Sequence, residues 1–390
     1  MRVLIVGGGI GGLTAALALR RAGFDTQVYE QASVLGEVGA GIATSPNSVR
    51  LLERLGVGDA LRAVAVTSLS MDPRDWQTGE TLARVPLGEA AVTRWGAPFY
   101  HLHRADLHGV LLAALGAQHV TLGARCVSVE EASSEVTIRF ADGRLATGDL
   151  VVGADGIHSV VRDYVAGDDR PVWSRQVAWR GLADGDLGRA IGLDVRHHSF
   201  WGPGKQFVCF YVSGGRLVNW VGNTQTDDEW REESWSARGE RSEAQRAYGG
   251  WFDQVQRLIA GTERVFKWAL FDRAPLDAWT RGRVTLLGDA AHPMLPYMAQ
   301  GGSQSIEDGW VLARCLAESP DSLPRALDRY VTYRSARAGA LQRTSREMGR
   351  NVQLSDPAAV RARNERMRAD PDAYIARYDW IFGHDADSDF

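Results

Sequence analysis

A run of glycines near the start of the chain has the residue types and spacing to hold two phosphate groups. It reads GGGIGG over residues 7–12 and satisfies G-x-G-x-x-G at Gly7, Gly9 and Gly12. Glycine permits the tight turn and the close approach of a pyrophosphate, and the amides of the following helix favour an anion. Glu30 follows eighteen residues after Gly12, where a carboxylate can accept the ribose hydroxyls of an adenosine. The pattern predicts a dinucleotide site and fits FAD and NAD equally well.

Two aspartates follow apolar strands further along the chain. Asp155 stands in GADGIHSVVR directly after LVV, and Asp289 stands in GDAAHP directly after VTLL. Ligands of open α/β sheets bind at the carboxyl ends of strands, so both carboxylates could contact the same nucleotide. Each aspartate could instead only cap a following helix. The residues alone leave both interpretations open.

Composition excludes several classes of function. The chain has 390 residues, with 44 Lys and Arg against 48 Asp and Glu, a formal charge of −4. This balance lacks the basic footprint of a nucleic-acid-binding protein and the polybasic anchor of a membrane-surface protein. No apolar run reaches the roughly 18 residues of a membrane-spanning helix. Three widely spaced cysteines form neither a disulfide framework nor a zinc site, so we expect no metal and a cytoplasmic protein.

Apolar periodicity predicts the elements that position these groups. The opening is a βαβ unit, with strands over 2–6 and 26–30 and a helix over 13–21. Residues 172–221 are predicted to be rich in β-strand, with a hairpin turn at 214–215. A further strand is expected over 284–287, and further helices over 47–55, 105–115, 303–316 and 323–348. The tail after Asp356 is predicted to be helical, and its acidic end, HDADSDF, to fray.

Four motifs in order carry a family resemblance. They are GGGIGGL with Glu30, HRADL at 103–107, ADGIHSVVR at 154–162 and GDAAHPMLPYMAQGG at 288–302. Together they resemble the class A flavoprotein aromatic hydroxylases, the para-hydroxybenzoate hydroxylase family. The most similar types are salicylate hydroxylase, 3-hydroxybenzoate 6-hydroxylase and 6-hydroxynicotinate 3-monooxygenase. The resemblance extends from Arg2 to about Phe382.

The resemblance implies an α/β fold, in which a discontinuous Rossmann-like FAD-binding domain carries an inserted mixed β-sheet substrate domain and C-terminal helices. The FAD-binding domain is expected to comprise residues 1–70, 101–171 and 280–330. The substrate domain is expected to comprise 71–100 and 172–279, and the C-terminal helical segment 331–390.

The resemblance also implies the roles of the cofactor-binding residues. Glu30 would bind the adenosine ribose, Arg104 the pyrophosphate or ribityl side, and Asp289 a ribityl hydroxyl. Pro296 and residues 301–302 would line the isoalloxazine ring, at a helix start whose dipole favours the reduced, anionic flavin. Asp155, with Arg162, would serve both FAD and the nicotinamide reductant. The full set of expected FAD contacts is Gly7, Gly9, Gly11, Gly12, Leu13, Glu30, Gln31, Gly41, Ile42, Arg104, Val127, Asp155, Asp289, Gly301 and Gly302.

The substrate side departs from the family pattern. Many relatives carry a motif like GPG-x-H-x-V-x-Y-P, whose histidine and tyrosine activate a phenol, whereas this chain reads GPGKQFVCFY over 202–211. Gln206 stands where the histidine is expected and Phe210 where the tyrosine is expected, and glutamine cannot take a proton at neutral pH. Either the substrate needs no deprotonation, or His197, His198 or Tyr297 performs it. A ring that is already electron-rich or anionic is therefore expected to be the better substrate.

The sequence thus predicts an enzyme that hydroxylates an aromatic or heteroaromatic substrate with NADH or NADPH and O₂. Tyr297, His198, Gln206 and Pro296 are the candidate catalytic residues. The candidate substrate contacts are Trp201, Phe210, Tyr211 and Trp220, each of which could instead be part of the core. We expect a monomer or homodimer with no nucleic-acid or membrane partner. An FAD oxidase or dehydrogenase, or a non-catalytic flavoprotein, stays open on the same fold.

Overall fold

The N-terminal strand lies in the middle of a mainly parallel sheet. β1 (Arg2–Val6) is buried along four of its five residues and pairs in parallel with β2 (Asp25–Tyr29) and β12 (Leu150–Gly153). The sheet continues with β20 (Val284–Leu286), β19 (Thr280–Arg281) and β8 (Val120–Thr121), in the order β19-β20-β12-β1-β2-β8. The computed structural model describes residues 1–35, 40–227, 237–388 and 390.

Three helices pack around this sheet. They are α1 (Ile10–Arg21), α5 (Arg104–Leu115) and α10 (Gly301–Glu318). A Cβ added to Gly309 of α10 would lie 2.8 Å from the backbone nitrogen of Ala15 in α1. Glycine at this position therefore lets α1 and α10 pack with their backbones in contact. This contact fixes the start of α10 relative to the glycine turn that precedes α1.

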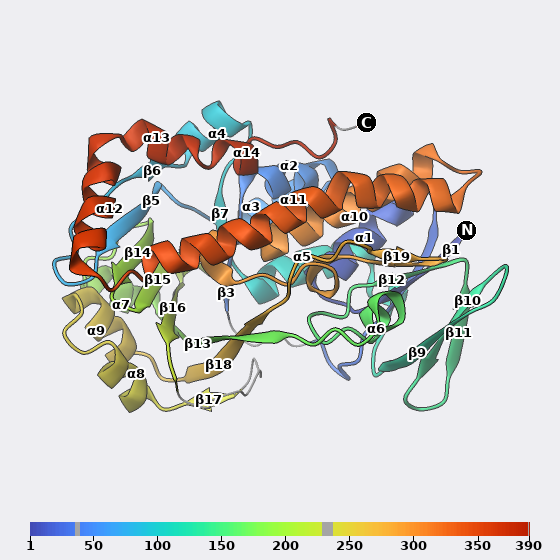
Figure 1. Cartoon of the computed structure of the whole chain (residues 1–390), viewed down its shortest axis with the longest axis horizontal. Helices are drawn as coiled ribbons and strands as arrows, with labels where there is room; N and C mark the ends of the chain where they lie inside the picture. The colour runs from blue at the N-terminus through green and yellow to red at the C-terminus, as the bar shows by residue number, and fades with distance from the viewer. Residues whose placement is uncertain (36–39, 228–236, 389) are drawn as a thin grey trace.

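A second, larger sheet lies beside the first along the long axis of the molecule (Figure 1). Its eight strands follow the order β17-β18-β13-β16-β15-β14-β5-β6, and all neighbours are antiparallel except β14 and β5. The strands are β5 (Ser70–Asp75), β6 (Val85–Pro86), β13 (Val172–Asp184), β14 (His197–Gly202), β15 (Lys205–Val212), β16 (Leu217–Gln225), β17 (Arg238–Gly239) and β18 (Val265–Asp272). The chain contributes β5 and β6 to this sheet between β2 and β8 of the first sheet, adds the other six strands after β12, and returns to the first sheet with β19 and β20.

Each face of the large sheet is covered by different elements. Trp220, Phe207 and Tyr248 belong to a core shared with α8 (Arg241–Ala247) and α9 (Asp253–Ala260), and we call this side the outer face. Trp201 and Ala178 belong to a core shared with the C-terminal helices, and we call this side the inner face. Side chains alternate between the two faces along each strand.

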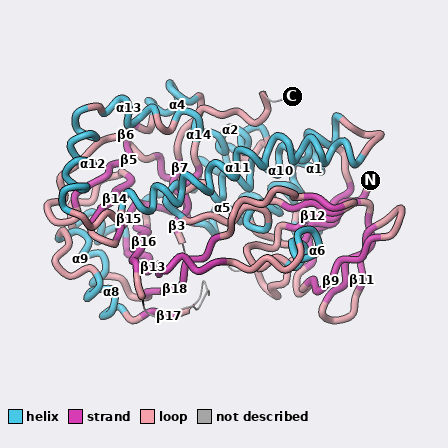
Figure 2. The backbone as a smooth tube through the Cα atoms, in the orientation of Figure 1, coloured by secondary structure: helices cyan, strands magenta, loops and turns pink. Residues whose placement is uncertain are grey.

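Short elements complete the fold (Figure 2). Two three-stranded antiparallel sheets are formed by β3 (Gly41–Thr44), β7 (Tyr100–His103) and β4 (Val66–Thr67), and by β9 (Cys126–Glu131), β10 (Val136–Phe140) and β11 (Leu145–Gly148). The remaining short helices are α2 (Pro46–Arg54), α3 (Gly58–Val64), α4 (Glu89–Trp95), α6 (Val160–Ala166) and α7 (Gly185–Ala190), with 3₁₀ turns η3 (Gly288–Ala290) and η4 (Pro296–Met298).

The C-terminal helices run back across the molecule. α11 (Leu323–Val352) extends along the long axis, and α12 (Pro357–Ala369), α13 (Pro371–Ala376) and α14 (Asp379–Phe382) follow it (Figure 1). The acidic end was expected to fray, and that expectation is wrong for its described residues. Arg54 donates to both oxygens of Asp385 at 2.5 and 2.7 Å, and Trp310 Nε1 donates to Asp387. The acidic residues are ordered because basic and indole donors of distant helices bind them.

The fold class expected from the sequence is confirmed. Both sheets, the mixed pairing of the second sheet and the C-terminal helices are present. The helix expected over 13–21 begins earlier, at Ile10, and the helix expected over 303–316 begins at Gly301, because each helix includes part of its glycine turn. Within the described ranges, no helix has the length and apolar character needed to cross a bilayer.

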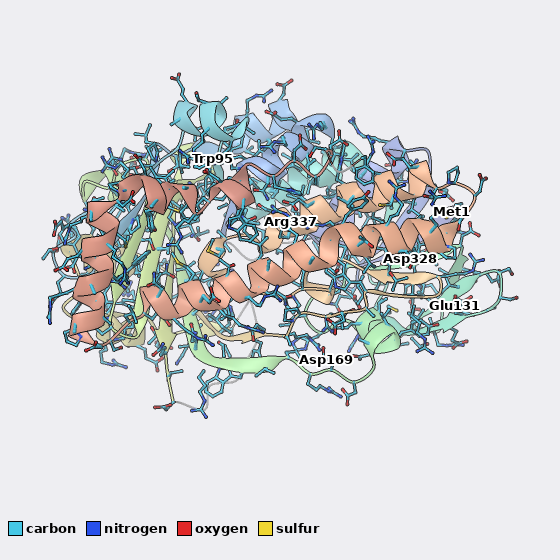
Figure 3. The ribbon with its side chains drawn as sticks, turned by 45° about the horizontal axis from the view of Figure 1, so that its top comes forward. Met1, Trp95, Glu131, Asp169, Asp328 and Arg337 are labelled. Carbon is cyan, nitrogen blue, oxygen red and sulfur yellow. The ribbon has the colours of Figure 1, made fainter. Side chains whose placement is uncertain are left out.

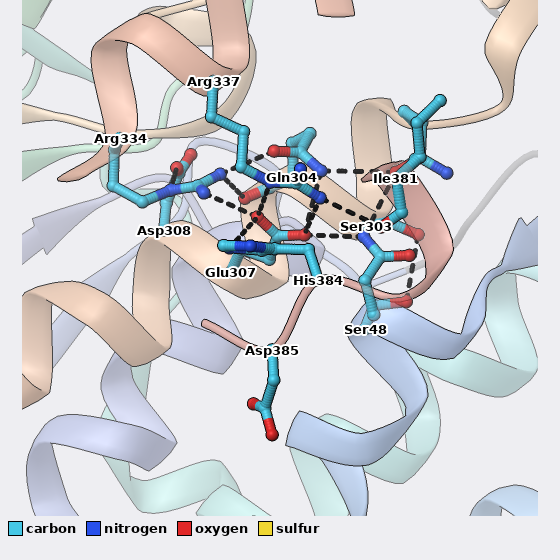
Figure 4. Close-up of polar contacts among 12 residues, drawn as sticks. Ser48, Ser303, Gln304, Glu307, Asp308, Arg334, Arg337, Ile381, His384 and Asp385 are labelled. Carbon is cyan, nitrogen blue, oxygen red and sulfur yellow. Dashed lines mark hydrogen bonds and ion pairs between the residues drawn. The ribbon is translucent and has the colours of Figure 1, made fainter. Parts of the chain in front are cut away.

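A buried ionic cluster holds these parts together (Figure 4). It comprises Glu307 and Asp308 of α10 and Arg334 and Arg337 of α11, all nearly or fully buried. Arg334 donates to Glu307 at 2.5 Å and to Asp308 at 2.8 Å, and Arg337 binds both oxygens of Glu307 at 2.8 and 3.0 Å. Burial alone would raise the pKa of Glu307, but the two guanidinium groups hold that pKa well below its usual range.

The cluster extends to elements far apart in sequence. Asn47 of α2 donates to Glu307 at 2.6 Å. Arg337 lies near the middle of α11 (Figure 3) and donates to the carbonyls of Trp380 and Ile381. Asp308 accepts from the backbone amide of Gly288 at 2.8 Å and lies 2.6 Å from His292 Nε2. The turn after β20, the start of α2 and the C-terminal segment are therefore all held by the same four charged residues.

We expect Asp308→Ala to destabilise the fold strongly. The change leaves Arg334 partly uncompensated and removes the acceptor of Gly288 and His292, a loss on the order of 3–5 kcal/mol. Urea unfolding followed by circular dichroism measures it. Asp328→Ala, an exposed site on α11, is the matched control and should change stability by less than about 0.5 kcal/mol. Equal unfolding midpoints for the two variants would contradict the role of the cluster.

Candidate active site

The glycine turn has the geometry of a phosphate-binding loop. Gly7 has φ +107°, and a Cβ there would lie 2.3 Å from the carbonyl oxygen of Ala154. A Cβ on Gly12 would lie 2.0 Å from the carbonyl oxygen of Gly7, whereas a Cβ on Gly9 would meet nothing within 4 Å. Gly9 is also the N-cap of α1 and makes no side-chain cap. The turn is therefore tight on its inner side, and open above Gly9, where the first amides of α1 can meet an anion.

Three charged side chains gather beside this turn. Glu30 accepts from the amide of Gly8 at 2.7 Å and from that of Ala32 at 2.8 Å. Burial lowers the pKa of Arg104, and the charges of Asp289 and Glu30 oppose that shift, so the guanidinium lies within range of both carboxylates. Surrounding protein raises the pKa of Asp289, yet its side chain keeps exposed surface. Asp289 is therefore surrounded by protein and still accessible to a ligand.

The residues expected to line a flavin meet at the start of α10. A Cβ on Gly302 would lie 2.7 Å from Cδ1 of Ile42, and a Cβ on Gly301 would lie 3.9 Å from Asp289 Oδ1. A Cβ on Gly41 would lie 2.5 Å from Cγ of Asn219 and 2.7 Å from Cε2 of Phe210. Pro296 is exposed on the loop before α10. β3, α10 and the large sheet thus converge beside Asp289. The glycines at the start of α10 and the Asp289 carboxylate fit the flavin end of FAD.

The other residues predicted to bind the cofactor either form hydrogen bonds within the protein or belong to elements other than α10. Asp155 accepts from Ser159 Oγ at 2.5 Å and from the amide of Val160 at 2.8 Å, so it caps the start of α6. Arg162 is buried and donates to the carbonyls of Ala290 and Ala291, which ties the Asp155 motif to the Asp289 motif. Among the remaining predicted positions, Leu13 of α1 is buried in the core, Gly11 of α1 is partly buried, and Gln31 after β2 and Val127 on β9 are exposed.

The inner face of the large sheet carries a partly exposed apolar centre. Val208 and Val221 pair across β15 and β16 and keep accessible surface among buried neighbours. Met294 and Ala299, from the loop before α10, are also partly buried and pack in the same core. We call these four residues the central patch. It lies between the large sheet and the flavin-lining loop, where a flat apolar ring could be held away from water.

A pair of histidines stands at one side of the central patch. His101 Nε2 lies 3.0 Å from His197 Nδ1, and the ring of Phe210 stacks on His101 at 4.1 Å between centroids. Burial, followed by the neighbouring histidine charges, lowers the pKa of His101 well below 6.5. Burial and His198 lower the pKa of His197 to about 3. Both imidazoles are therefore neutral at physiological pH and act as hydrogen-bonding groups.

Gln206 lies at the other side of the central patch and has partners at both ends of its amide. Its Nε2 donates to Ser199 Oγ at 2.9 Å, and its Oε1 accepts from Asn223 Nδ2 at 3.2 Å. Ser199 Oγ also accepts from Trp201 Nε1 at 2.7 Å. This position, where the family motif has a histidine, thus holds an uncharged amide network.

Several predicted residues do not face the central patch. The structure places His198, Tyr211 and Trp220 on the outer face, where His198 binds Asp194 and Trp220 donates to Thr262. Trp201 and Phe210 are on the inner face, as a strand alternation of two requires. Tyr297 is buried between Gln176, to which it donates, and Gln353, which donates to it at 2.9 Å. We therefore leave His198, Tyr211 and Trp220 out of the proposed substrate site.

Sequence reasoning missed three buried polar residues, of which two are on the inner face and one, His101 of β7, stacks against it. His101 precedes the HRADL motif by two residues, while Asn219 and Asn223 flank Val221 on β16. Asn219 accepts from the amide of Gly41 at 2.7 Å, which joins the large sheet to the flavin-lining strand. A signal was present: in LVNWVGN the asparagines recur every four residues, on the same side of a strand as Val221.

The neutral histidine pair predicts a loss of stability in acid. A histidine with a folded pKa below its unfolded pKa of about 6.5 stabilises the fold above pH 6.5, and that contribution falls as pH drops. For His197 the loss extends toward pH 3. His197→Gln should reduce the slope of unfolding free energy against pH between 6 and 4, by up to about 1.4 kcal/mol per pH unit. The exposed His158→Gln variant is the control, and equal slopes for both variants would refute the assignment.

The comparisons with known proteins agree with this geometry. The family model described as FAD binding domain matches residues 1–345. The chain is 43% identical over 387 residues to the 3-amino-4-hydroxybenzoate 2-monooxygenase PtmB3 of Streptomyces platensis, covering 99% of this chain and 96% of that protein. It is 37% identical over 358 residues to the 6-hydroxynicotinate 3-monooxygenase of Pseudomonas fluorescens, covering 89% and 90% of the two chains.

A solved structure of similar shape binds the expected cofactor. Klebsiella pneumoniae HpxO, complexed with FAD and uric acid, superposes with a TM-score of 0.87 at 31% sequence identity, covering 97% of this chain and 95% of that chain. The family resemblance, the cofactor and the enzyme class expected from the sequence are confirmed. The chain belongs to the FAD-binding-domain family and is an FAD-dependent monooxygenase of aromatic or heteroaromatic substrates.

Proposed function

We propose that the substrate is a single-ring hydroxybenzoate that carries an amino group. The observation that carries this proposal is Gln206, which is held by Ser199 and Asn223 where the family motif has a proton-accepting histidine. A phenol of pKa about 10 is only about 0.1% ionised at pH 7 without a base. The amino group of an aminophenol donates electron density to the ring without any proton transfer. The 43% identity to a 3-amino-4-hydroxybenzoate 2-monooxygenase supports the same substrate class.

We assign the cofactor contacts to the groups that converge beside the glycine turn. Glu30 binds the adenosine ribose, Arg104 faces the diphosphate and Asp289 binds a ribityl hydroxyl. The first amides of α10 face the ring, where their partial positive charge favours a reduced, anionic flavin. Bound FAD supplies hydride acceptance from NADH or NADPH and activation of O₂. The protein positions the substrate against the flavin and excludes water at the central patch.

The remaining proposals concern organisation. We propose a cytoplasmic monomer or homodimer, with FAD-binding segments 1–70, 101–171 and 280–330. The substrate domain comprises 71–100 and 172–279, which is supported by the pairing of β5 with β14 and of β6 with β5 in the large sheet. The C-terminal segment 331–390 then covers the inner face of that sheet, as the core it shares with Trp201 supports.

Glu30→Ala and Asp289→Ala should each lower FAD occupancy. Each change removes a charged hydrogen-bond acceptor, on the order of 1–3 kcal/mol. Glu30→Ala also frees the amide of Gly8 from the bond that shapes the glycine turn. The ratio of flavin to protein absorbance after purification measures occupancy. Asp328→Ala is the control, and full occupancy in both site variants would show that these carboxylates do not hold FAD.

The substrate proposal is tested with matched benzoates. Substrate-stimulated NAD(P)H oxidation, with product analysis after reaction under ¹⁸O₂, should show kcat/KM for 3-amino-4-hydroxybenzoate at least tenfold above that for 4-hydroxybenzoate or salicylate. Efficient hydroxylation of either plain hydroxybenzoate would contradict the proposal. Product without ¹⁸O would contradict monooxygenation itself.

Gln206→His should restore a proton acceptor at the family position. We expect the variant to improve kcat/KM for 4-hydroxybenzoate more than for the aminohydroxybenzoate, because only the plain phenol lacks internal activation. Gln225→His is the matched control, since Gln225 lies on the neighbouring strand one row further from the central patch. The same change in both variants would show that the gain does not come from Gln206.

A further inference from the structure

Two buried asparagines on β16 each have one amide atom without a hydrogen-bond partner among the described residues. Asn219 Nδ2 and Asn223 Oδ1 make no hydrogen bond with any described residue, although the side chains are 1% and 3% exposed. A buried amide atom without a partner costs about 1–3 kcal/mol. One atom is a donor and the other an acceptor, and both side chains lie on the inner face with Val221 between them. Such atoms call for a ligand that supplies one acceptor and one donor.

The partners of each asparagine fix which atom is left over. Asn219 Oδ1 is occupied by the amide of Gly41 at 2.7 Å, which leaves Nδ2 as the donor. Asn223 Nδ2 is occupied by Gln206 Oε1 at 3.2 Å, which leaves Oδ1 as the acceptor. The Gln206 amide is in turn oriented by its bond to Ser199. Neighbouring groups of the protein therefore determine that Asn219 offers a donor and Asn223 an acceptor.

The spacing of the two asparagines suits one aromatic ring. Four residues along a strand span about 13 Å. If a hydrogen bond of about 3 Å is made at each end, about 7 Å of this separation remains for the ligand itself. One benzene ring with a substituent at each end has about that length. Val221 and Val208 of the central patch lie between the two ends and offer an apolar surface to the ring.

The charge near the Asn219 end favours an anion. Arg180 pairs across the sheet with Val221, midway between the two asparagines, and its guanidinium carbon lies 5.2 and 4.9 Å from the ring centroids of Phe266 and Trp268. Its charge acts on His103, which pairs with Gly41, and Gly41 donates to Asn219, so the guanidinium lies toward the Asn219 end. Burial, followed by the charge of Arg104, lowers the pKa of Arg180 to about 10, so it stays cationic at neutral pH. The Asn223 end is formed by the uncharged groups of Gln206 and Ser199. A carboxylate therefore belongs at the Asn219 end, and a neutral donor at the Asn223 end.

We propose that Asn219 and Asn223 are the specificity pair that orients the substrate across the central patch. Asn219 Nδ2 donates to the carboxylate, and Asn223 Oδ1 accepts from the ring amino group. This inference rests on the proposed function and adds to it the residues that distinguish an aminohydroxybenzoate from a plain hydroxybenzoate.

Isosteric variants separate the two roles. Dissociation constants of 3-amino-4-hydroxybenzoate and 4-hydroxybenzoate are measured by titrating the visible absorbance of the FAD-loaded protein. Asn223→Leu should weaken binding of the amino compound about tenfold and leave the plain compound unchanged. Asn223→Asp, which can only accept, should keep the preference for the amino compound. Asn219→Asp keeps the bond to Gly41 but loses the Nδ2 donor. It should therefore raise the dissociation constants of both compounds by a similar factor.

The controls and contrary outcomes are distinct. Gln225→Leu, on the same strand and face but one row outside the central patch, should leave both constants unchanged. If wild-type protein prefers the amino compound and Asn223→Leu keeps that preference, the specificity pair is wrong and the proposed function stands. Loss of the preference in Asn223→Asp as well as in Asn223→Leu would show that a donor, not an acceptor, faces the substrate. Preference of the wild-type protein for 4-hydroxybenzoate would overturn the proposed function, and the pair with it.

Discussion

The buried ionic cluster of Glu307, Asp308, Arg334 and Arg337 is the constraint on which the remaining site geometry depends. Its carboxylates belong to the seventh and eighth residues of α10, and its guanidinium groups come from α11. Removing charge from water is costly, so such a cluster is stable only when every member is paired. The pairs hold the start of α10, the turn that carries Asp289 and the start of α2 in one arrangement. This arrangement determines the positions of the flavin-lining groups.

The substrate side depends on the alternation of the large sheet. One face packs against α8 and α9 through an aromatic and aliphatic core around Trp220, and the opposite face carries neutral polar residues around the central patch. Beside the patch, Arg180 packs against the rings of Phe266 and Trp268, and the histidines and amides described above are neutral, because a dry site cannot hold an unpaired charge cheaply. The same uncharged character suits a ring whose own substituent supplies the activation. Architecture and proposed chemistry therefore point to the same kind of substrate.

Local spacing was enough to bring together the residues that we assign to the cofactor. Gly7, Glu30 and Asp289 each stand next to a strand end, so their neighbourhood could be inferred from sequence distance alone. The substrate side required strand register, since a shift of one residue moves a side chain to the other face. His198 was chosen in the catalytic set, yet its neighbour His197 faces inward, and Trp220 was chosen while the adjacent Asn219 faces inward. The ordered acidic tail was missed because its partners are distant in sequence: Trp310 lies 77 residues before Asp387, and Arg54 lies 331 residues before Asp385.

That distance has a consequence for how the protein is made. Arg50 of α2 donates to the carbonyls of Phe382 and His384, so its partners leave the ribosome more than 300 residues after it does. The N-terminal sheet can form early, but α2 waits for the last helix to arrive. Contacts of such sequence separation slow folding and prolong the exposure of unpaired surface. Nascent chains of this protein should therefore depend on chaperones until synthesis is almost finished, and bind FAD only afterwards.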